Sequence, residues 1–287
     1  MLDIYQTVTD RIISALEAGT VPWRMPWLGG SAGCVSYASG RPYSLLNHLL
    51  LGGVSGEYVT FEQAKRAGGF VRSGEKSKLV VFWKPFETVN EETGEVETHF
   101  CLRYYHVFHL IQCEGIRPRW ETVPAAVLQP DAAAELIIHD YITRSGVRFT
   151  ATRSNQAFYR PSTDEVVVPE LTQYTELSEY YSTAFHELTH STGHPSRLNR
   201  ITDTASFGSQ AYSKEELCAE LGAAFLLNRC GLETKGSITN NAAYLAGWLK
   251  ALKNDKRLLV HAAGAAEKAV SFILNKKGDE GDAGDRE

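Results

Sequence analysis

The sequence has no pair of cysteines at metal-binding or redox spacing. Its five cysteines form an odd set without a Cys-x-x-Cys motif, which argues against a disulfide framework and against a cysteine zinc site. A long apolar run is also missing, because no stretch approaches the roughly 20 residues that cross a bilayer. Residues 1–19 carry charges on an amphipathic pattern, unlike a signal peptide. We therefore expect a cytoplasmic protein without membrane contact.

An excess of positive charge is missing as well. The 287 residues include 29 Lys and Arg against 34 Asp and Glu, a net charge of −5. Any contact with nucleic acid therefore has to come from a local patch. The N-terminal 120 residues hold as many basic as acidic residues, so the acidic excess lies after them. With 43% hydrophobic residues, the chain can bury a core.

The N-terminal part is predicted to be α+β. Apolar residues recur at helical spacing over residues 5–16 and predict an opening helix. Thr60 and Gln63 stand at capping-box spacing and predict a short helix that ends near Gly68. Segments 79–85 and 99–110 are β-branched and aromatic, and the polar residues between them predict a long β-hairpin.

Prolines punctuate residues 118–130, and we place a domain boundary there. The expected domains are 1–120 and 121–275, and the acidic, glycine-rich segment 276–287 is expected to be a disordered tail. The second domain is also α+β by pattern. Its predicted elements are a helix capped by Asp131, strands at 147–152, 157–160 and 165–168, helices at 176–192 and 213–230, and a last helical region over about 240–274.

The motif His-Glu-x-x-His runs from His186 to His190 in an apolar-faced helix. Residues four apart share one face of a helix, so both imidazoles can bind one ion. Glu187 beside them can accept a proton from metal-bound water and pass it to a leaving amine. Short strands, this helix and a turn follow one another in the order that a zincin needs. The motif predicts a site for zinc, or for another divalent metal such as Mn²⁺, with Glu187 as the catalytic base.

A peptidase-type zinc site needs a third protein ligand. The metzincin pattern would place a histidine at position 196, but that residue is Ser196. His194 follows Gly193 directly, too near to reach around to the ion. The metzincin arrangement is therefore rejected.

The third ligand is expected on the following helix. Glu216 and Glu220 lie four apart and share a face, and Glu215 is expected to point elsewhere. A gluzincin-like pattern favours Glu216 as the ligand and Glu220 as the residue that orients a ligating histidine. Ser213 could instead form a capping box with Glu216, which would make Glu220 the ligand. Both assignments stay open, with Glu216 favoured.

Basic and aromatic residues interleave in the N-terminal half. Residues 60–86 carry six Lys and Arg against two Glu. Proteins bind single-stranded nucleic acid with cations that contact phosphates and rings that stack on bases. The candidate DNA-binding residues are Trp23, Arg24, Trp27, Lys65, Arg66, Arg72, Lys76, Lys78, Trp83, Lys84 and Arg103.

Five blocks of the sequence resemble the ArdC antirestriction family in matching order: "PWRMPW", "YVTFEQAKRAGGFVRSGEKSKLVVFW", "YYHVFHLIQCEGI", "FHELTHSTGHPSRLNR" and "YSKEELCAELGAAFL". The resemblance implies an N-terminal domain that binds single-stranded DNA and a C-terminal zincin-like, gluzincin-type metallopeptidase domain. Plasmids and other mobile elements carry such proteins to protect incoming DNA from host restriction, notably during conjugation. For this sequence it implies His186 and His190 as metal ligands, Glu187 as general base, and an acidic helix with Glu216 and Glu220.

Two hypotheses follow. In the first, the protein is a zinc peptidase that DNA binding delivers to its substrates, which would be DNA-bound proteins or components of the host restriction system. In the second, it only coats single-stranded DNA, and the metal site stabilises the fold. Glu187 favours the first hypothesis, because a purely structural site does not need it.

Overall fold

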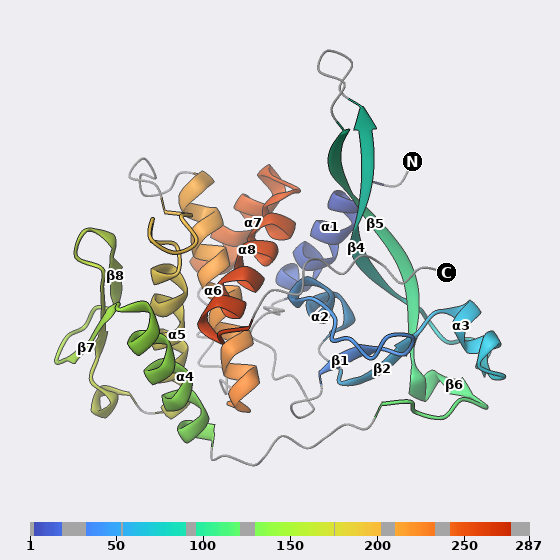
Figure 1. Ribbon diagram of the computed structural model, residues 1–287, viewed down its shortest axis with the longest axis horizontal. Helices are drawn as coiled ribbons and strands as arrows, with labels where there is room; N and C mark the ends of the chain where they lie inside the picture. The colour runs from blue at the N-terminus through green and yellow to red at the C-terminus, as the bar shows by residue number, and fades with distance from the viewer. Residues whose placement is uncertain are drawn as a thin grey trace. The chain divides into compact units, whose positions relative to one another are not determined.

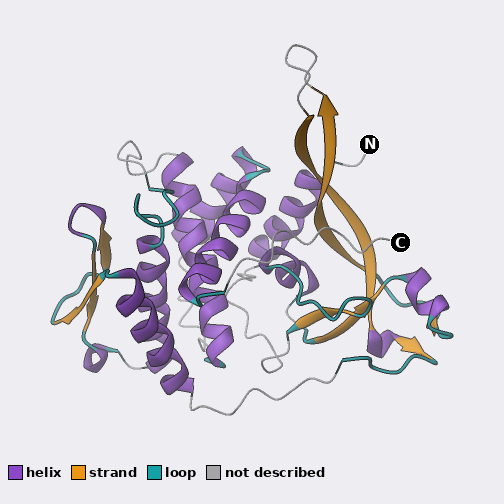
Figure 2. Ribbon diagram, in the orientation of Figure 1, coloured by secondary structure: helices purple, strands orange, loops and turns teal. Residues whose placement is uncertain are grey.

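The computed structural model describes residues 3–18, 33–52, 54–89, 96–120, 130–174, 176–201, 210–232 and 242–276. They group into two compact units. The first unit holds the described residues from 33 to 120, and the second holds those from 130 to 276 together with residues 5–18. Helices and strands are mixed, as Figure 2 shows, which confirms the predicted α+β class. The block "PWRMPW" and the tail from residue 277 onward lie outside the described residues.

A four-stranded sheet in the order β1-β2-β5-β4 forms the first unit (Figure 1). β1 (Cys34–Ser36) runs parallel to β2 (Gly56–Val59), and β2 pairs with the end of β5 (Val96–His109). β4 (Lys78–Val89) pairs with β5 along its whole length. The predicted hairpin is confirmed. Both strands extend beyond the predicted segments. Polar residues give no indication of a strand in the sequence, but a two-stranded hairpin that is exposed on both faces accepts them.

α2 (Leu45–Leu51), which the sequence did not predict, covers part of the β4 edge. Ser44 caps its N-terminus, and Gly52 ends it in the left-handed conformation at φ 70°. The Asn47 amide donates to the Val81 carbonyl at 2.7 Å and accepts from the Val81 N–H at 2.8 Å. Asn47 thereby satisfies the outward backbone groups of one edge residue, which would otherwise be open to another strand.

α3 (Phe61–Arg66) is the predicted short helix, and its Thr60–Gln63 capping box is present. After it, β3 (Phe70–Val71) pairs antiparallel with β6 (Cys113–Glu114), which follows the short 3₁₀ helix η2 (Leu110–Gln112). The central core of this unit consists of Cys34, Tyr43, Leu51, Tyr58, Val80 and Val107.

In the second unit, a three-stranded sheet follows the first helix after the linker and precedes the metal helix, as predicted. Its order is β7-β9-β8, with β9 parallel to β7 and antiparallel to β8. The strands are β7 (Arg148–Thr152), β8 (Phe158–Arg160) and β9 (Glu165–Pro169), and the 3₁₀ helices η3 (Pro161–Thr163) and η4 (Leu171–Gln173) flank β9.

The helices of this unit are α4 (Pro130–Ser145), α5 (Leu177–Ser191), α6 (Gln210–Cys230), α7 (Ala242–Asn254) and α8 (Leu258–Ile273). Asp131 lies in the first turn of α4 and does not cap it. The prediction was wrong there because proline, which lacks an N–H, is itself favoured at the first helical position. Tyr141, Phe185, Leu188 and Leu226 are buried where these helices meet the sheet. No helix among the described residues is long and apolar enough to cross a membrane.

α1 (Ile4–Glu17) forms as predicted, but its contacts are with the second unit. Thr9 donates a hydrogen bond to the Lys256 carbonyl at 2.8 Å, and Glu17 forms an ion pair with Lys253 at 2.7 Å. At α1, the expected domain 1–120 therefore differs from the first compact unit, because the contacts of this helix group it with the second unit. An apolar stripe shows that one face of a helix is buried, and it does not show which part of the chain covers it.

Candidate metal centre and nucleic-acid surface

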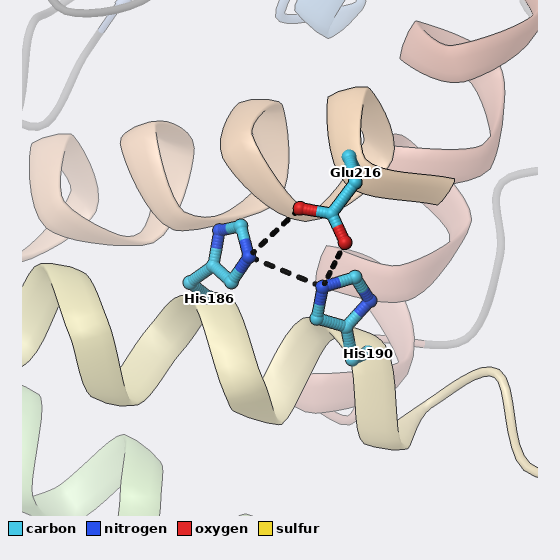
Figure 3. Close-up of side chains that lie close together, drawn as sticks. All are labelled: His186, His190 and Glu216. Carbon is cyan, nitrogen blue, oxygen red and sulfur yellow. Dashed lines mark hydrogen bonds and ion pairs between the residues drawn. The ribbon is translucent and has the colours of Figure 1, made fainter. Parts of the chain in front are cut away.

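Two histidines of α5 converge on one point. His186 and His190 are one turn apart, and their Nε2 atoms lie 3.1 Å from each other, as Figure 3 shows. Their rings meet edge to face with centroids 4.7 Å apart. Both side chains are largely buried, with 21% and 12% of their surface exposed. The helix thus presents two imidazole nitrogens to one site, at the spacing read from the sequence.

Glu216 of α6 completes this donor group. Its carboxylate oxygens lie 3.7 Å from His186 Nε2 and 3.6 Å from His190 Nε2 (Figure 3). The three donor atoms lie within 4.8 Å of one another, and the described residues contain no second group of this kind. Two imidazoles and one carboxylate are a zinc-peptidase donor set, and such a set leaves a position for water or substrate. The residues therefore fit a divalent metal ion.

The structure separates the two acidic candidates of α6. The helix begins at Gln210, so Ser213 lies inside it and Glu216 takes no part in an N-terminal capping box. Glu220, one turn further along, does not belong to the donor group.

Glu215 takes the position beside His190 that was expected of Glu220. Its Oε1 lies 3.2 Å from His190 Nδ1, the ring nitrogen remote from the donor group. The expectation that Glu215 points elsewhere was wrong. The two nitrogens of one imidazole point in different directions, so adjacent residues of α6 can contact both of them. Burial works to raise the pKa of Glu215, but hydrogen bonds from His190 and Arg200 hold it below its usual range.

Arg200 fixes the Glu215 carboxylate. Its Nε lies 3.1 Å from Oε2, and its Nη2 lies 2.9 Å from Oε1. The same guanidinium donates to Thr192 Oγ1 at 2.8 Å and to the Thr189 carbonyl at 2.9 Å. Arg200 thus ties α6 to the last turn of α5. Sequence reasoning missed it, since eight residues of irregular chain separate Arg200 from the end of α5.

Glu187 lies on α5, on the side that faces β8 of the sheet. Its side chain is only 8% exposed, and burial raises its pKa to about 7. The charge of His190 opposes this shift, the charge of Glu216 adds to it, and a hydrogen bond with the backbone of Tyr159 in β8 opposes it. A carboxylate poised near neutral pH beside a metal donor group can accept and return a proton.

A second buried arginine joins the sheet to the turn after α5. Arg197 donates to the Ser191 carbonyl at 2.8 Å and to Asp164 Oδ2 at 3.0 Å. Tyr159 donates to the same carboxylate at 2.8 Å. Ser196 occupies the rejected metzincin position, and it forms a hydrogen bond with His194 at 2.7 Å.

The predicted DNA-binding residues fall into several environments. Arg72 forms an ion pair with Glu75 at 2.7 Å. Lys78 donates to the Leu51 carbonyl at the base of the hairpin, and burial lowers its pKa. Trp83, Lys84 and Arg103 are exposed on β4 and β5, Lys65 and Arg66 are exposed on α3, and Lys76 is exposed just before β4. Trp23, Arg24 and Trp27 lie outside the described residues.

Comparison with protein families gives a match for each half of the chain. Residues 2–108 match the N-terminal domain of the anti-restriction factor ArdC, and residues 137–265 match a zincin-like metallopeptidase family. Two DNA primases TraC of Escherichia coli are 36% and 34% identical to this chain over 94% of its length. The chain spans only 27% and 20% of those primases. The protein y4eC of Sinorhizobium fredii is 33% identical, with 96% of this chain and 93% of y4eC covered.

Two solved structures resemble the chain over nearly its whole length. Both are of the antirestriction protein ArdC from plasmid R388, one metal-free and one bound to Mn(II). They superpose with a TM-score of 0.74 each, at 34% and 32% sequence identity. The metal-free match covers 96% of this chain and 98% of the R388 protein, and the Mn(II) match covers 97% and 100%.

Proposed function

Since this chain belongs to the ArdC antirestriction family, we propose that it binds single-stranded DNA and protects incoming DNA from host restriction. In this proposal, DNA binding belongs to the part before the linker and metal chemistry to the part after it. Mobile elements enter a new host in single-stranded form during conjugation, so a protein that binds single strands meets the DNA when it needs protection.

The convergence of His186, His190 and Glu216 beside buried Glu187 is the observation that carries the enzymatic part of this proposal. These three residues would hold the ion, which we take to be zinc. Mn²⁺ is the alternative, because the R388 relative binds Mn(II). When bound, the ion would supply a Lewis acid that polarises a carbonyl and lowers the pKa of water.

The residues of this chain account for the proton transfers of peptide hydrolysis. The Glu187 carboxylate is placed to take a proton from the attacking water and to return it to the departing amine. Glu215 and Arg200 hold the His190 ring, so its Nε2 stays directed at the donor group. The proposed substrates are proteins bound to the incoming DNA or components of the host restriction system, which binding to the same DNA would bring close.

A restriction-protection assay in cells tests the proposal. Plasmid DNA entering a restricting host is scored with wild type, with Glu187→Gln, and with Glu179→Gln as a matched control two turns earlier on α5. Expression, metal content and affinity for oligo-dT are measured in parallel. We expect Glu187→Gln to keep metal and DNA binding and to lose protection, with Glu179→Gln like wild type.

Full protection by Glu187→Gln would overturn the enzymatic part and leave the other hypothesis, a protein that coats single-stranded DNA around a structural metal site. Failure of the wild type to bind oligo-dT would overturn the DNA-binding part.

A further inference from the structure

The outer half of the β4–β5 hairpin is a two-stranded ribbon. β2 pairs with β5 only at Phe108 and His109, close to the end of the strand. On the other edge, Asn47 of α2 reaches β4 at Val81. Beyond these points β4 and β5 pair only with each other among the described residues, and Figure 1 shows them extending past the rest of the sheet. Both faces of this ribbon hold exposed side chains, although Leu102, opposite Trp83, is buried.

The pairing register assigns each side chain to one of two faces. Residues directly opposite each other in an antiparallel pair share a face, and neighbours along a strand alternate. Phe82 pairs with Arg103, Lys84 with Cys101, and Phe86 with His99. These residues, with Tyr105, form one face, which we call the basic face. Trp83, Pro85, Phe100 and Tyr104 form the other, which we call the apolar face.

Ring contacts support this division. Phe82 meets Tyr105 with centroids 5.4 Å apart, and Phe86 meets His99 at 5.5 Å, both on the basic face. Aromatic rings and cations therefore alternate on that surface.

The two faces differ in charge. Lys84 and Arg103 are both exposed, and neither forms an ion pair with a described residue. They are diagonal neighbours, a relation that places Cα atoms roughly 7–8 Å apart. The apolar face carries no Lys or Arg. Phosphates are thus attracted to one face only, although both offer aromatic rings.

We propose that single-stranded DNA runs along the basic face, with phosphates on Lys84 and Arg103 and bases stacked on Phe82 and Phe86. Tyr105, which packs against the core at the base of the hairpin, supports the Phe82 ring. This inference rests on the proposed DNA-binding function and names the surface that performs it. Rings supply sequence-tolerant stacking and cations follow the backbone, the two contacts that non-specific binders of single strands combine. Trp83, a predicted DNA-binding residue, lies on the opposite face and takes no part.

Aromatic substitutions on the two faces make a matched comparison. Phe86 is 45% exposed and Trp83 is 41% exposed, three residues apart on the same strand. Affinity for a fluorescent dT oligonucleotide is measured by anisotropy for Phe86→Ala and Trp83→Ala. Loss of one stacked base costs about tenfold in affinity. We expect that loss for Phe86→Ala and less than a twofold change for Trp83→Ala, and the reverse order would overturn the inference.

Salt dependence tests the cations separately. For single strands, each phosphate contact contributes about −0.7 to the slope of log K against log salt concentration. Lys84→Gln and Arg103→Gln are each expected to make the slope shallower by about 0.7. Lys250→Gln, an exposed cation on α7, is the control and is expected to leave the slope unchanged. An unchanged slope in both Lys84→Gln and Arg103→Gln would overturn the inference.

The natural cysteines give a test that does not depend on how a variant folds. Cys101 is half-buried on the basic face, Cys113 is half-buried on β6, and the other three cysteines are buried. Alkylation of the wild-type protein is followed by mass spectrometry with and without oligo-dT. We expect DNA to slow the reaction of Cys101 several-fold and to spare Cys113. If the wild type binds oligo-dT and Cys101 reacts at an unchanged rate, this inference fails and the proposed function stands; if the wild type does not bind, the proposed function itself fails.

Discussion

His190 and Glu215 meet at the nitrogen that faces away from the donor group, with Nδ1 and Oε1 3.2 Å apart. A carboxylate in this position accepts a hydrogen bond from the Nδ1–H group, so the neutral ring presents the lone pair of Nε2 to a metal. The tautomer and the orientation of His190 are therefore set by a residue that does not itself belong to the donor group.

The first prediction concerns these acidic residues of α6. We expect Glu215→Gln to weaken metal binding by about 10- to 100-fold, the usual effect of removing a hydrogen-bond partner of a ligating histidine. Glu216→Gln should lose more, because it removes a donor atom. Glu220→Gln is the matched control and should bind metal like wild type. Competition with a chromogenic chelator measures all three. A loss in Glu220→Gln as large as that in Glu216→Gln would contradict the donor group described here.

The second prediction concerns the buried pair of Arg197 and Asp164. Burial works to raise the pKa of Asp164, but hydrogen bonds from Arg197 and Tyr159 hold it below its usual range. A carboxyl whose pKa is lowered by folding stabilises the protein above its unfolded pKa of about 3.9, and this contribution is lost as the pH falls through the folded value. Asp164→Asn should therefore lower the free energy of unfolding by about 2–4 kcal/mol at pH 7.

Urea unfolding at pH 7, 5 and 3, with metal chelated, measures this effect. The difference between wild type and Asp164→Asn should shrink toward pH 3. Asparagine tolerates the left-handed backbone of this position, φ 49°, so the substitution adds little strain. Asp140→Asn is the control, because Asp140 pairs with Arg144 on the surface and is 60% exposed. It should cost under about 0.5 kcal/mol. Equal losses at pH 3 and pH 7 would assign the effect of Asp164 to shape and not to charge.

Much of the metal site could be predicted because it depends on local geometry. The spacing of His186 and His190 places both rings on one face of any helix, whatever that helix packs against. Glu216 could be favoured because it and Glu220 stand four apart on the next helix, which is the gluzincin-like pattern. Arg200 could not be found, because its contact with Glu215 depends on how an irregular turn folds back over α5.

The proposed DNA-binding surface could also be predicted only in part from the sequence. Composition identifies basic and aromatic residues, but the register of β4 and β5 decides which of them share a face. Lys78 has the right charge, yet the structure uses it to bond the Leu51 carbonyl. A one-residue shift of register would move Trp83 to the face of Arg103, and residue types alone do not distinguish the two pairings.

The third prediction concerns the close approach of α5 and α6. A Cβ atom added to Gly222 would lie 2.7 Å from both Cγ2 and Oγ1 of Thr189, a buried residue of α5 that directly precedes His190 in the sequence. Alanine gains about 1 kcal/mol in helix propensity over glycine, but overpacking of a core contact costs about 1–3 kcal/mol. We expect Gly222→Ala to destabilise the protein by about 1 kcal/mol and to weaken metal binding, because α6 carries Glu216.

Gly264 of α8 provides the control. An added Cβ there meets nothing within 4 Å, so Gly264→Ala should stabilise the protein by about 0.5–1 kcal/mol. Combining Gly222→Ala with Thr189→Ala removes the clash and should recover part of the lost stability, a coupling that urea unfolding can measure. Additive effects of the two substitutions would show that these residues do not meet.

The fourth prediction is that metal stabilises the second unit through this donor group. A ligand that binds only the folded state adds RT ln(1 + [L]/Kd), which is about 2.7 kcal/mol at 100 times Kd. For a unit of this size that corresponds to a rise in Tm of about 5–10 °C. His186→Ala should abolish the rise, whereas His194→Ala, a nearby histidine outside the donor group, should retain it. Differential scanning calorimetry with added Zn²⁺ and Mn²⁺ measures both variants, and the larger shift at equal free concentration identifies the preferred ion. An equal rise in His186→Ala and wild type would place the bound metal elsewhere.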